Sequence, residues 1–295
     1  MQQDKYTQKM LNVLLFIQQH LDDPLDAARL AEICGYSPSH FHRVFKGMVG
    51  ETLKEHIRRL RLERAALRLL ASEKNVTDIA FGAGYETHEA FSRAFKQMFG
   101  KSPSAFRNEF TRPRFPEIPS GIHFQPENIS ENIALKPQGG PIMNVEIKQM
   151  KKNQVAFIRH TGPYAECRTA WEALCNWAGP KGLFGPDTRF IGACYDDPSI
   201  TAPEKIRMDV CLTLSRPVEP EGQVGLQEIG GFECAVYLHK GPYEQLEKVY
   251  AELFGQWLPQ SGREAQGGPS YEVYLNDCTQ TTPEELLTEI WIPLK

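Results

Sequence analysis

Apolar residues recur at helical spacing along the first part of the chain. A longer pattern of the same kind begins at Leu53 and predicts a helix over residues 53–71. We therefore expect an all-α region over residues 5–110. The first segment shows the spacing most simply, with apolar side chains at Met10, Leu14, Ile17 and Leu21.

The composition changes near residue 111. Between residues 111 and 141 proline and glycine are frequent, and such a stretch holds neither a helix nor a central strand for long. We predict a linker over residues 111–142, between a domain at 1–110 and another at 143–295.

Short runs typical of β-strands follow from Asn144 onward. Two helical stretches lie between them, near residues 163–178 and 242–258. The predicted strands are 145–147, 155–158, 208–214, 233–238, 271–275 and 289–292.

The N-terminal half contains an internal repeat with an offset of about 50 residues. The blocks 30–36 and 41–46 recur as 79–85 and 91–96. In each copy a helix carries a small residue, Ala31 or Ala80, where a second helix must approach closely. Gly35 or Gly84 follows it and permits a left-handed turn.

A second helix follows each turn, with Ser37 or Thr87 placed to cap its first turn. Its two phenylalanines stand four residues apart and so share one face, which we expect to face the core. The polar residues between them then face outward, as in a helix-turn-helix whose second helix enters the major groove of DNA. The two pairs are Phe41 with Phe45 and Phe91 with Phe95.

The second copy of the repeat and the residues after it form a longer motif. It consists of Gly84-Tyr85-Glu86, Phe91-Ser92-Arg93-Ala94-Phe95-Lys96, Gly100-Lys101-Ser102-Pro103 and Phe106-Arg107. On these residues the chain resembles, over residues 5–110, the AraC/XylS type of transcription regulators. The resemblance implies two helix-turn-helix units, joined by a long helix at 53–71, that read two successive major-groove segments.

Polar side chains on the two predicted recognition helices are the candidate DNA contacts. An arginine such as Arg43 or Arg93 can bond guanine with two hydrogen bonds, and Glu89 can accept one from cytosine. The basic cluster Arg58, Arg59 and Arg61 either contacts phosphates or forms a solvated face. The candidates are Ser39, His40, His42, Arg43 and Lys46 on the first helix, and His88, Glu89, Ser92, Arg93 and Gln97 on the second.

The C-terminal half repeats as well, with an offset near 80 residues. The block 160–164 recurs as 239–243, and each copy follows a strand and opens a helix with proline in its first turn. We predict an α+β domain of two pseudo-symmetric strand-helix-strand-strand repeats, with an antiparallel sheet and helices on one side. The junction of the repeats is a concave site of the kind that holds small ligands.

From Asn144 to the C-terminus the chain resembles the GyrI-like small-molecule-binding domain, on residues 241–243, 268–277 and 288–293. The resemblance implies an aromatic-lined pocket with an acidic centre for cationic, lipophilic compounds, and Glu272 matches its pocket glutamate. An organic cation would offset the cost of burying a carboxylate and gain cation–π attraction. We predict Glu289 on the neighbouring strand, and walls from Tyr164, Trp171, Tyr195, Tyr237, Tyr243 and Trp291.

Charge divides the chain in the same way. Residues 1–114 hold 18 Lys and Arg against 13 Asp and Glu, whereas residues 115–295 hold 15 against 24. The basic half favours phosphates as partners. The seven cysteines form no C-x-x-C pair and suggest neither a disulfide framework nor a zinc site, so we expect reduced, mostly buried thiols.

These features together predict a multidomain, ligand-responsive transcription regulator that is not an enzyme and needs no metal or cofactor. Its expected partners are double-stranded DNA, a small-molecule effector and RNA polymerase. The chain lacks a long apolar run and a signal peptide, so we expect a cytoplasmic protein without a membrane partner. Two alternatives stay open for the C-terminal domain: a hydrolase, or a protein-interaction module such as a gyrase-binding domain.

Overall fold

The computed structural model describes residues 5–108, 113–126, 135 and 143–295. The chain divides into two compact units, Met1–Gly139 and Gly140–Lys295. Among the described residues, no helix is both long enough and apolar enough to cross a membrane. All seven cysteines are free thiols, four of them buried.

The first unit is all-α, as predicted. Each recognition helix begins at a side-chain cap, because Ser37 accepts a hydrogen bond from the His40 amide and Thr87 accepts one from the Ala90 amide. Gly35 adopts a φ of 67° after α2 and so ends that helix with a left-handed turn. The helices are α1 (Lys5–Gln19), α2 (Ala27–Cys34), α3 (Pro38–Val49), α4 (Leu53–Ala71), α5 (Val76–Gly82), α6 (His88–Phe99) and α7 (Pro103–Arg107).

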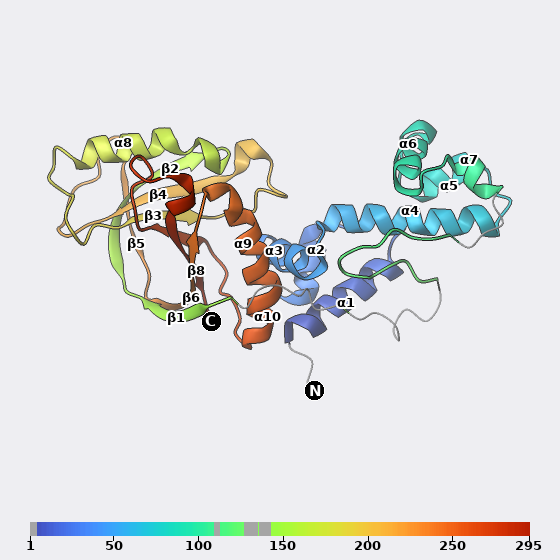
Figure 1. Cartoon of the computed structure of the whole chain (residues 1–295), viewed down its shortest axis with the longest axis horizontal. Coiled ribbons are helices and arrows are strands. Elements are labelled where there is room, and N and C mark those ends of the chain that lie inside the picture. The colour runs from blue at the N-terminus through green and yellow to red at the C-terminus, as the bar shows by residue number, and fades with distance from the viewer. Residues whose placement is uncertain (1–4, 109–112, 127–134, 136–142) are drawn as a thin grey trace. The chain divides into compact units, whose positions relative to one another are not determined.

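The repeat produces two helix-turn-helix pairs, α2–α3 and α5–α6, joined by the long helix α4 (Figure 1). A capping box fixes the start of α4, where Thr52 and Glu55 exchange hydrogen bonds. All four repeated phenylalanines are fully buried, at 0% exposure, so the predicted core faces of the recognition helices are confirmed: Phe41, Phe45, Phe91 and Phe95.

Part of the predicted linker packs against this unit. Residues 113–126 form neither helix nor strand, which agrees with their proline content, yet Ser120 and Ile122 are 0% and 4% exposed. Phe115 packs against the core of the second helix-turn-helix. The rest of the predicted linker, apart from residue 135, lies outside the described residues.

The second unit alternates strands and helices. Two of its strands, β3 and β5, lie outside the six predicted runs. The strands are β1 (Val145–Met150), β2 (Asn153–Thr161), β3 (Phe190–Cys194), β4 (Arg207–Thr213), β5 (Gly225–Ile229), β6 (Phe232–Lys240), β7 (Ser270–Tyr274) and β8 (Leu287–Pro293).

The main helices of this unit follow the first strand of each repeat. A π-helical turn, η4 (Leu253–Trp257), joins two helices of the second repeat. The helices are α8 (Arg168–Ala178), α9 (Leu246–Glu252) and α10 (Leu258–Ser261), and the 3-10 turns are η1 (Tyr164–Glu166), η2 (Pro203–Lys205), η3 (Tyr243–Gln245) and η5 (Pro283–Glu285).

All eight strands form one antiparallel sheet in the order β1-β6-β8-β7-β3-β4-β2-β5. The two repeats, β2-α8-β3-β4 and β6-α9-β7-β8, meet at the central pair β3–β7. The outer strands are exchanged, because β1 pairs with the second repeat and β5 with the first. Figure 1 shows the sheet curling, with α8 along one face. Buried residues pack in separate clusters on the two faces, and α8 covers one of them.

Candidate functional site

The second recognition helix, α6, presents three of its predicted contacts away from its buried phenylalanines and the other two beside them. Glu89, Arg93 and Gln97 are exposed, while His88 and Ser92 are half-buried. Ser92 Oγ lies 3.5 Å from His88 Nε2, one turn away along the helix. This face carries hydrogen-bonding groups of both signs, which suits the edges of base pairs.

The first recognition helix, α3, carries all five of its predicted contacts, but His40 and His42 are buried, at 9% and 7% exposure, rather than facing outward as predicted. The ring of His40 lies edge-on against Tyr36, with 4.5 Å between the ring centroids. The ring of His42 contacts Phe41 at 5.6 Å. Aromatic contacts within the unit therefore hold both histidines. Ser39, Arg43 and Lys46 lie along the same helix.

The basic cluster of α4 is engaged within the protein. Arg59, whose side chain is 10% exposed, pairs with Glu51 and Glu63 at 2.6 and 2.8 Å. Arg61 donates to the carbonyl oxygens of Leu21 and Asp23 at the end of α1. The sequence left two alternatives open for this cluster, a phosphate contact or a solvated face. Arg59 and Arg61 instead make structural contacts within the protein.

In the second unit, Glu272 lies on the central strand β7 and is 7% exposed. Its carboxylate accepts hydrogen bonds from the hydroxyls of Tyr274 at 2.8 Å and Tyr250 at 3.2 Å. The thiol of Cys194 donates a third, at 3.6 Å. These residues come from β7, α9 and β3, so both repeats contribute to the surroundings of the carboxylate.

Aromatic rings surround Tyr274. Trp171 from α8 and Tyr243 from η3 both meet its ring edge-on, with centroids 5.7 and 5.6 Å away. Burial raises the pKa of Tyr274 well above its ordinary value, and the charge of Glu272 raises it further. Burial likewise raises the pKa of Tyr243. Both phenols stay protonated, and Tyr274 acts as a donor to Glu272.

Gly192 lies directly opposite Glu272 on strand β3. A Cβ atom at this position would lie 2.3 Å from Met208 Cε and 2.9 Å from the Tyr274 hydroxyl oxygen. The glycine therefore leaves room for the hydroxyl that donates to Glu272.

Three of the predicted site residues lie on the other face of the sheet. Glu289 is on the neighbouring strand β8, as predicted, but its cross-strand partner is Val273 rather than Glu272. Neighbouring residues of a strand point to opposite faces, so Glu289 and Glu272 face opposite sides. Trp291 donates to Glu289 at 3.0 Å, and Tyr195 donates to Asp209 at 2.9 Å.

Within the described ranges, His, Cys, Asp and Glu side chains nowhere form a group of three or more that could hold a metal ion.

The model of a GyrI-like small molecule binding domain matches residues 143–295, and a helix-turn-helix domain model matches residues 30–109. The first match spans more than half of the chain. The chain belongs to the GyrI-like family.

Several known proteins are similar to one part of this chain. The regulatory protein SoxS of Escherichia coli is 36% identical over 102 residues, which cover 34% of this chain and 95% of SoxS. A solved complex of EcmrR with DNA matches with a TM-score of 0.47 and 18% identity, over 52% of this chain and 58% of EcmrR. A hydrolase from Listeria innocua matches with a TM-score of 0.39 and 16% identity, over 53% of this chain and 94% of the hydrolase.

An AraC-type DNA-binding domain thus precedes a GyrI-like domain, and the chain is a DNA-binding transcription regulator of this type. The predicted fold class, an all-α domain followed by an α+β domain, is confirmed.

The remaining predicted wall residues of the GyrI-like domain lie on the Glu272 face. Tyr237 is cross-strand partner to Ile290, which is in turn the partner of Glu272, so its side chain shares that face two strands away. Tyr164 packs in the same cluster as Trp171 and Tyr274, and its hydroxyl donates to the Asp196 carbonyl oxygen at 2.7 Å.

Three contacts of Glu272 in the GyrI-like domain were absent from the predicted set, although the sequence holds a signal for each. Tyr274 stands two residues from Glu272 on a strand and so shares its face. Tyr250 is the repeat equivalent of Trp171, and Cys194 is the repeat equivalent of Tyr274 at the offset of about 80 residues.

Proposed function

We propose that this regulator reads a specific DNA sequence with α3 and α6, and that its GyrI-like domain binds a small lipophilic cation at Glu272. The observation that carries the ligand proposal is the carboxylate of Glu272 among aromatic side chains from both repeats. Tyr274 and Tyr250 donate to it, and the rings of Trp171 and Tyr243 contact Tyr274.

A carboxylate and aromatic faces select for the same ligand chemistry. The carboxylate supplies negative charge, and rings of tryptophan and tyrosine attract a cation through their electron-rich faces. An organic cation would replace one of the tyrosine hydroxyls at Glu272. The displaced ring would then shift against α8 or α9, and so couple occupancy to the packing of the domain.

The effect on transcription follows from differential affinity. A ligand that prefers one packing of the GyrI-like domain shifts the chain toward that packing. We propose that the shift changes DNA affinity or contact with RNA polymerase. In this proposal the domain is a sensor and the chain is not an enzyme.

A thermal-shift titration with tetraphenylphosphonium tests the ligand site. All four tryptophans lie between residues 171 and 291, so their fluorescence reports the unfolding of the GyrI-like domain. Ligand that binds only the folded state raises the melting temperature with concentration. We expect this rise in the wild type and its loss in Glu272→Gln.

Glu289→Gln is the matched control, because it removes a carboxylate from the other face of the same sheet. It should keep the response, and the neutral compound triphenylphosphine oxide should stabilise less than the cation. An equal response in wild type and Glu272→Gln would refute the proposed site. Consumption of an added ester by the wild type, lost in Glu272→Gln, would instead favour the hydrolase.

A further inference from the structure

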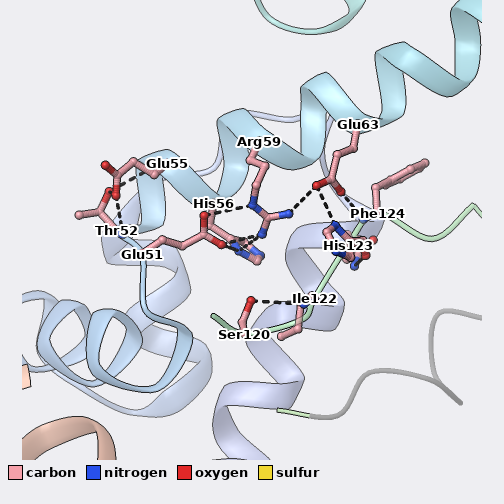
Figure 2. Close-up of polar contacts among 11 residues, drawn as sticks. Glu51, Thr52, Glu55, His56, Arg59, Glu63, Ser120, Ile122, His123 and Phe124 are labelled. Atoms are coloured by element: carbon pink, nitrogen blue, oxygen red, sulfur yellow. Dashed lines mark hydrogen bonds and ion pairs between the residues drawn. The ribbon is translucent and has the colours of Figure 1, made fainter. Parts of the chain in front are cut away.

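The segment 113–126, called the strap below, meets a buried carboxylate on α4 (Figure 2). Glu63 is 0% exposed. Its Oε2 accepts a hydrogen bond from the Phe124 amide at 2.7 Å, and its Oε1 lies 3.0 Å from His123 Nδ1. Arg59 donates to the same Oε1 at 2.8 Å. The strap thus supplies two of the groups that satisfy this carboxylate.

The strap also joins α1, which packs on the first helix-turn-helix. Gln18 is 4% exposed, and its amide nitrogen donates to the His123 carbonyl oxygen at 2.9 Å. Its amide oxygen accepts from the Gln125 amide at 3.1 Å. Backbone groups of the strap therefore satisfy both the nitrogen and the oxygen of the buried Gln18 amide. Docking requires that these backbone groups stand at fixed positions relative to Gln18.

The other end of the strap contacts the second recognition helix. Phe115 packs against Phe99 of α6, with 6.4 Å between the centroids. Its ring also stacks on His123, at 5.4 Å and an interplanar angle of 24°. A continuous set of contacts thus runs from α6 through the strap to α4 and α1.

We infer that the strap fixes the two recognition helices relative to one another, and that DNA recognition by this chain depends on residues beyond the matched helix-turn-helix region 30–109. The inference rests on the proposed reading of DNA by both α3 and α6. Glu63, Gln18, His123 and Phe115 are positioning residues in this scheme.

The physical reason is preorganisation. The two helix-turn-helix pairs lie along one long helix, and a hinge motion within the unit changes the distance between the major-groove segments that they reach. A second connection in parallel with α4 restricts that motion. A DNA site whose two segments match the fixed distance between α3 and α6 then binds better than a site with another spacing. The docked unit already has the geometry that such a site requires, so it does not lose orientational freedom on binding.

Selection from a random DNA library by the full chain tests the inference. The wild type should enrich two blocks of preferred bases with one spacing between them. Ile122→Asp places a carboxylate at a buried strap position and should undock the strap, while His123→Ala removes the side-chain contacts with Glu63 and Phe115 and leaves the backbone hydrogen bonds of the strap in place. Glu117→Ala changes an exposed strap residue and is the control.

We expect Ile122→Asp to enrich the same two blocks with a broad distribution of spacings, His123→Ala to broaden it less, and Glu117→Ala to match the wild type. Circular dichroism must show that each variant keeps the helical content of the wild type. If Ile122→Asp fails this check, His123→Ala alone decides. A folded variant with the wild-type spacing distribution overturns the inference. A wild type that enriches only one block refutes the proposed two-helix reading instead.

Discussion

Gly192 and Glu272 lie directly opposite each other on β3 and β7, at positions that the internal repeat makes equivalent. The pseudo-twofold axis of the domain therefore passes between a residue with no side chain and a buried carboxylate. A Cβ atom at residue 192 of the first repeat would crowd the Tyr274 hydroxyl, which belongs to the second repeat. The missing side chain at Gly192 therefore leaves space for Tyr274.

Gly192→Ala should lower the free energy of unfolding of the GyrI-like domain by about 1–3 kcal/mol, the usual cost of overpacking a core. The new methyl group would meet Met208 and the Tyr274 hydroxyl. Urea unfolding followed by tryptophan fluorescence measures this cost. In a Tyr274→Phe background the cost should be smaller, since one of the two obstructing atoms is gone.

Gly185→Ala is the control for that experiment, because the nearest atom to its Cβ would be Thr188 Oγ1 at 3.9 Å. Its effect should stay within about 0.5 kcal/mol, as for an ordinary surface change. An equal cost for Gly192→Ala in both backgrounds would show that the Tyr274 hydroxyl does not depend on the glycine.

Arg93→Ala should weaken binding to a selected DNA site by about 1–3 kcal/mol and relax the preference at one base pair, if the arginine reads a base edge. Arg93 is exposed on α6. Fluorescence anisotropy with the selected site and with single-base variants measures both effects. Lys248→Ala removes the same charge from the GyrI-like domain and should change neither. A uniform loss across all sequences would assign Arg93 to a phosphate instead.

The pH dependence of the first unit should include a contribution from Glu51. Burial alone would raise the pKa of Glu51, but hydrogen bonds from His56 and Arg59 and the charge of Arg59 outweigh it and lower the value from 4.5 to about 2. A carboxyl group whose pKa is lower in the folded state than in the unfolded state stabilises the fold at pH values above its unfolded-state pKa. That stability is lost as the pH falls from about 4.5 to about 2.

The free energy of unfolding should fall by roughly 3 kcal/mol as the pH decreases from about 4.5 to about 2. Urea unfolding between pH 2 and 5 measures it through the helical signal at 222 nm, because the first unit is all-α. Glu51→Gln should be less stable than the wild type at pH 5 and should approach it at pH 2. A constant difference between the two proteins over this range would contradict the shifted pKa.

The helices of the first unit were predictable because the signals for them are local. The start of α4 at Leu53 and its end at Ala71 agree with the predicted helix 53–71. Caps at Ser37 and Thr87, and turns at Gly35 and Gly84, depend only on residues within a few positions. Such signals are present before any tertiary contact forms.

The strands β3 and β5 lacked a comparable signal. β3 has only five residues, with Gly192 in the middle, and β5 begins at Gly225. Glycine weakens the intrinsic preference for a strand. β3 forms because it is paired on both sides, with β4 and β7. The pairing, rather than the local sequence, decides its conformation.

The strap also combines a feature that the sequence predicts with one that depends on tertiary contacts. Its prolines indicate correctly that it forms no regular element, but composition does not say whether such a segment packs. Gln18 and His123 are more than 100 positions apart in the chain, so no local pattern connects them.

The sequence by itself determined the two repeats, the bounds of the long helix α4 and the presence of a glutamate in the central strand of the GyrI-like domain. Only the tertiary structure decided which side chains surround that glutamate. Strand register places Ile290 rather than Glu289 opposite Glu272, and a shift of one residue would reverse the faces. Register depends on pairing and on side-chain packing between distant segments, and these exist only in the folded chain.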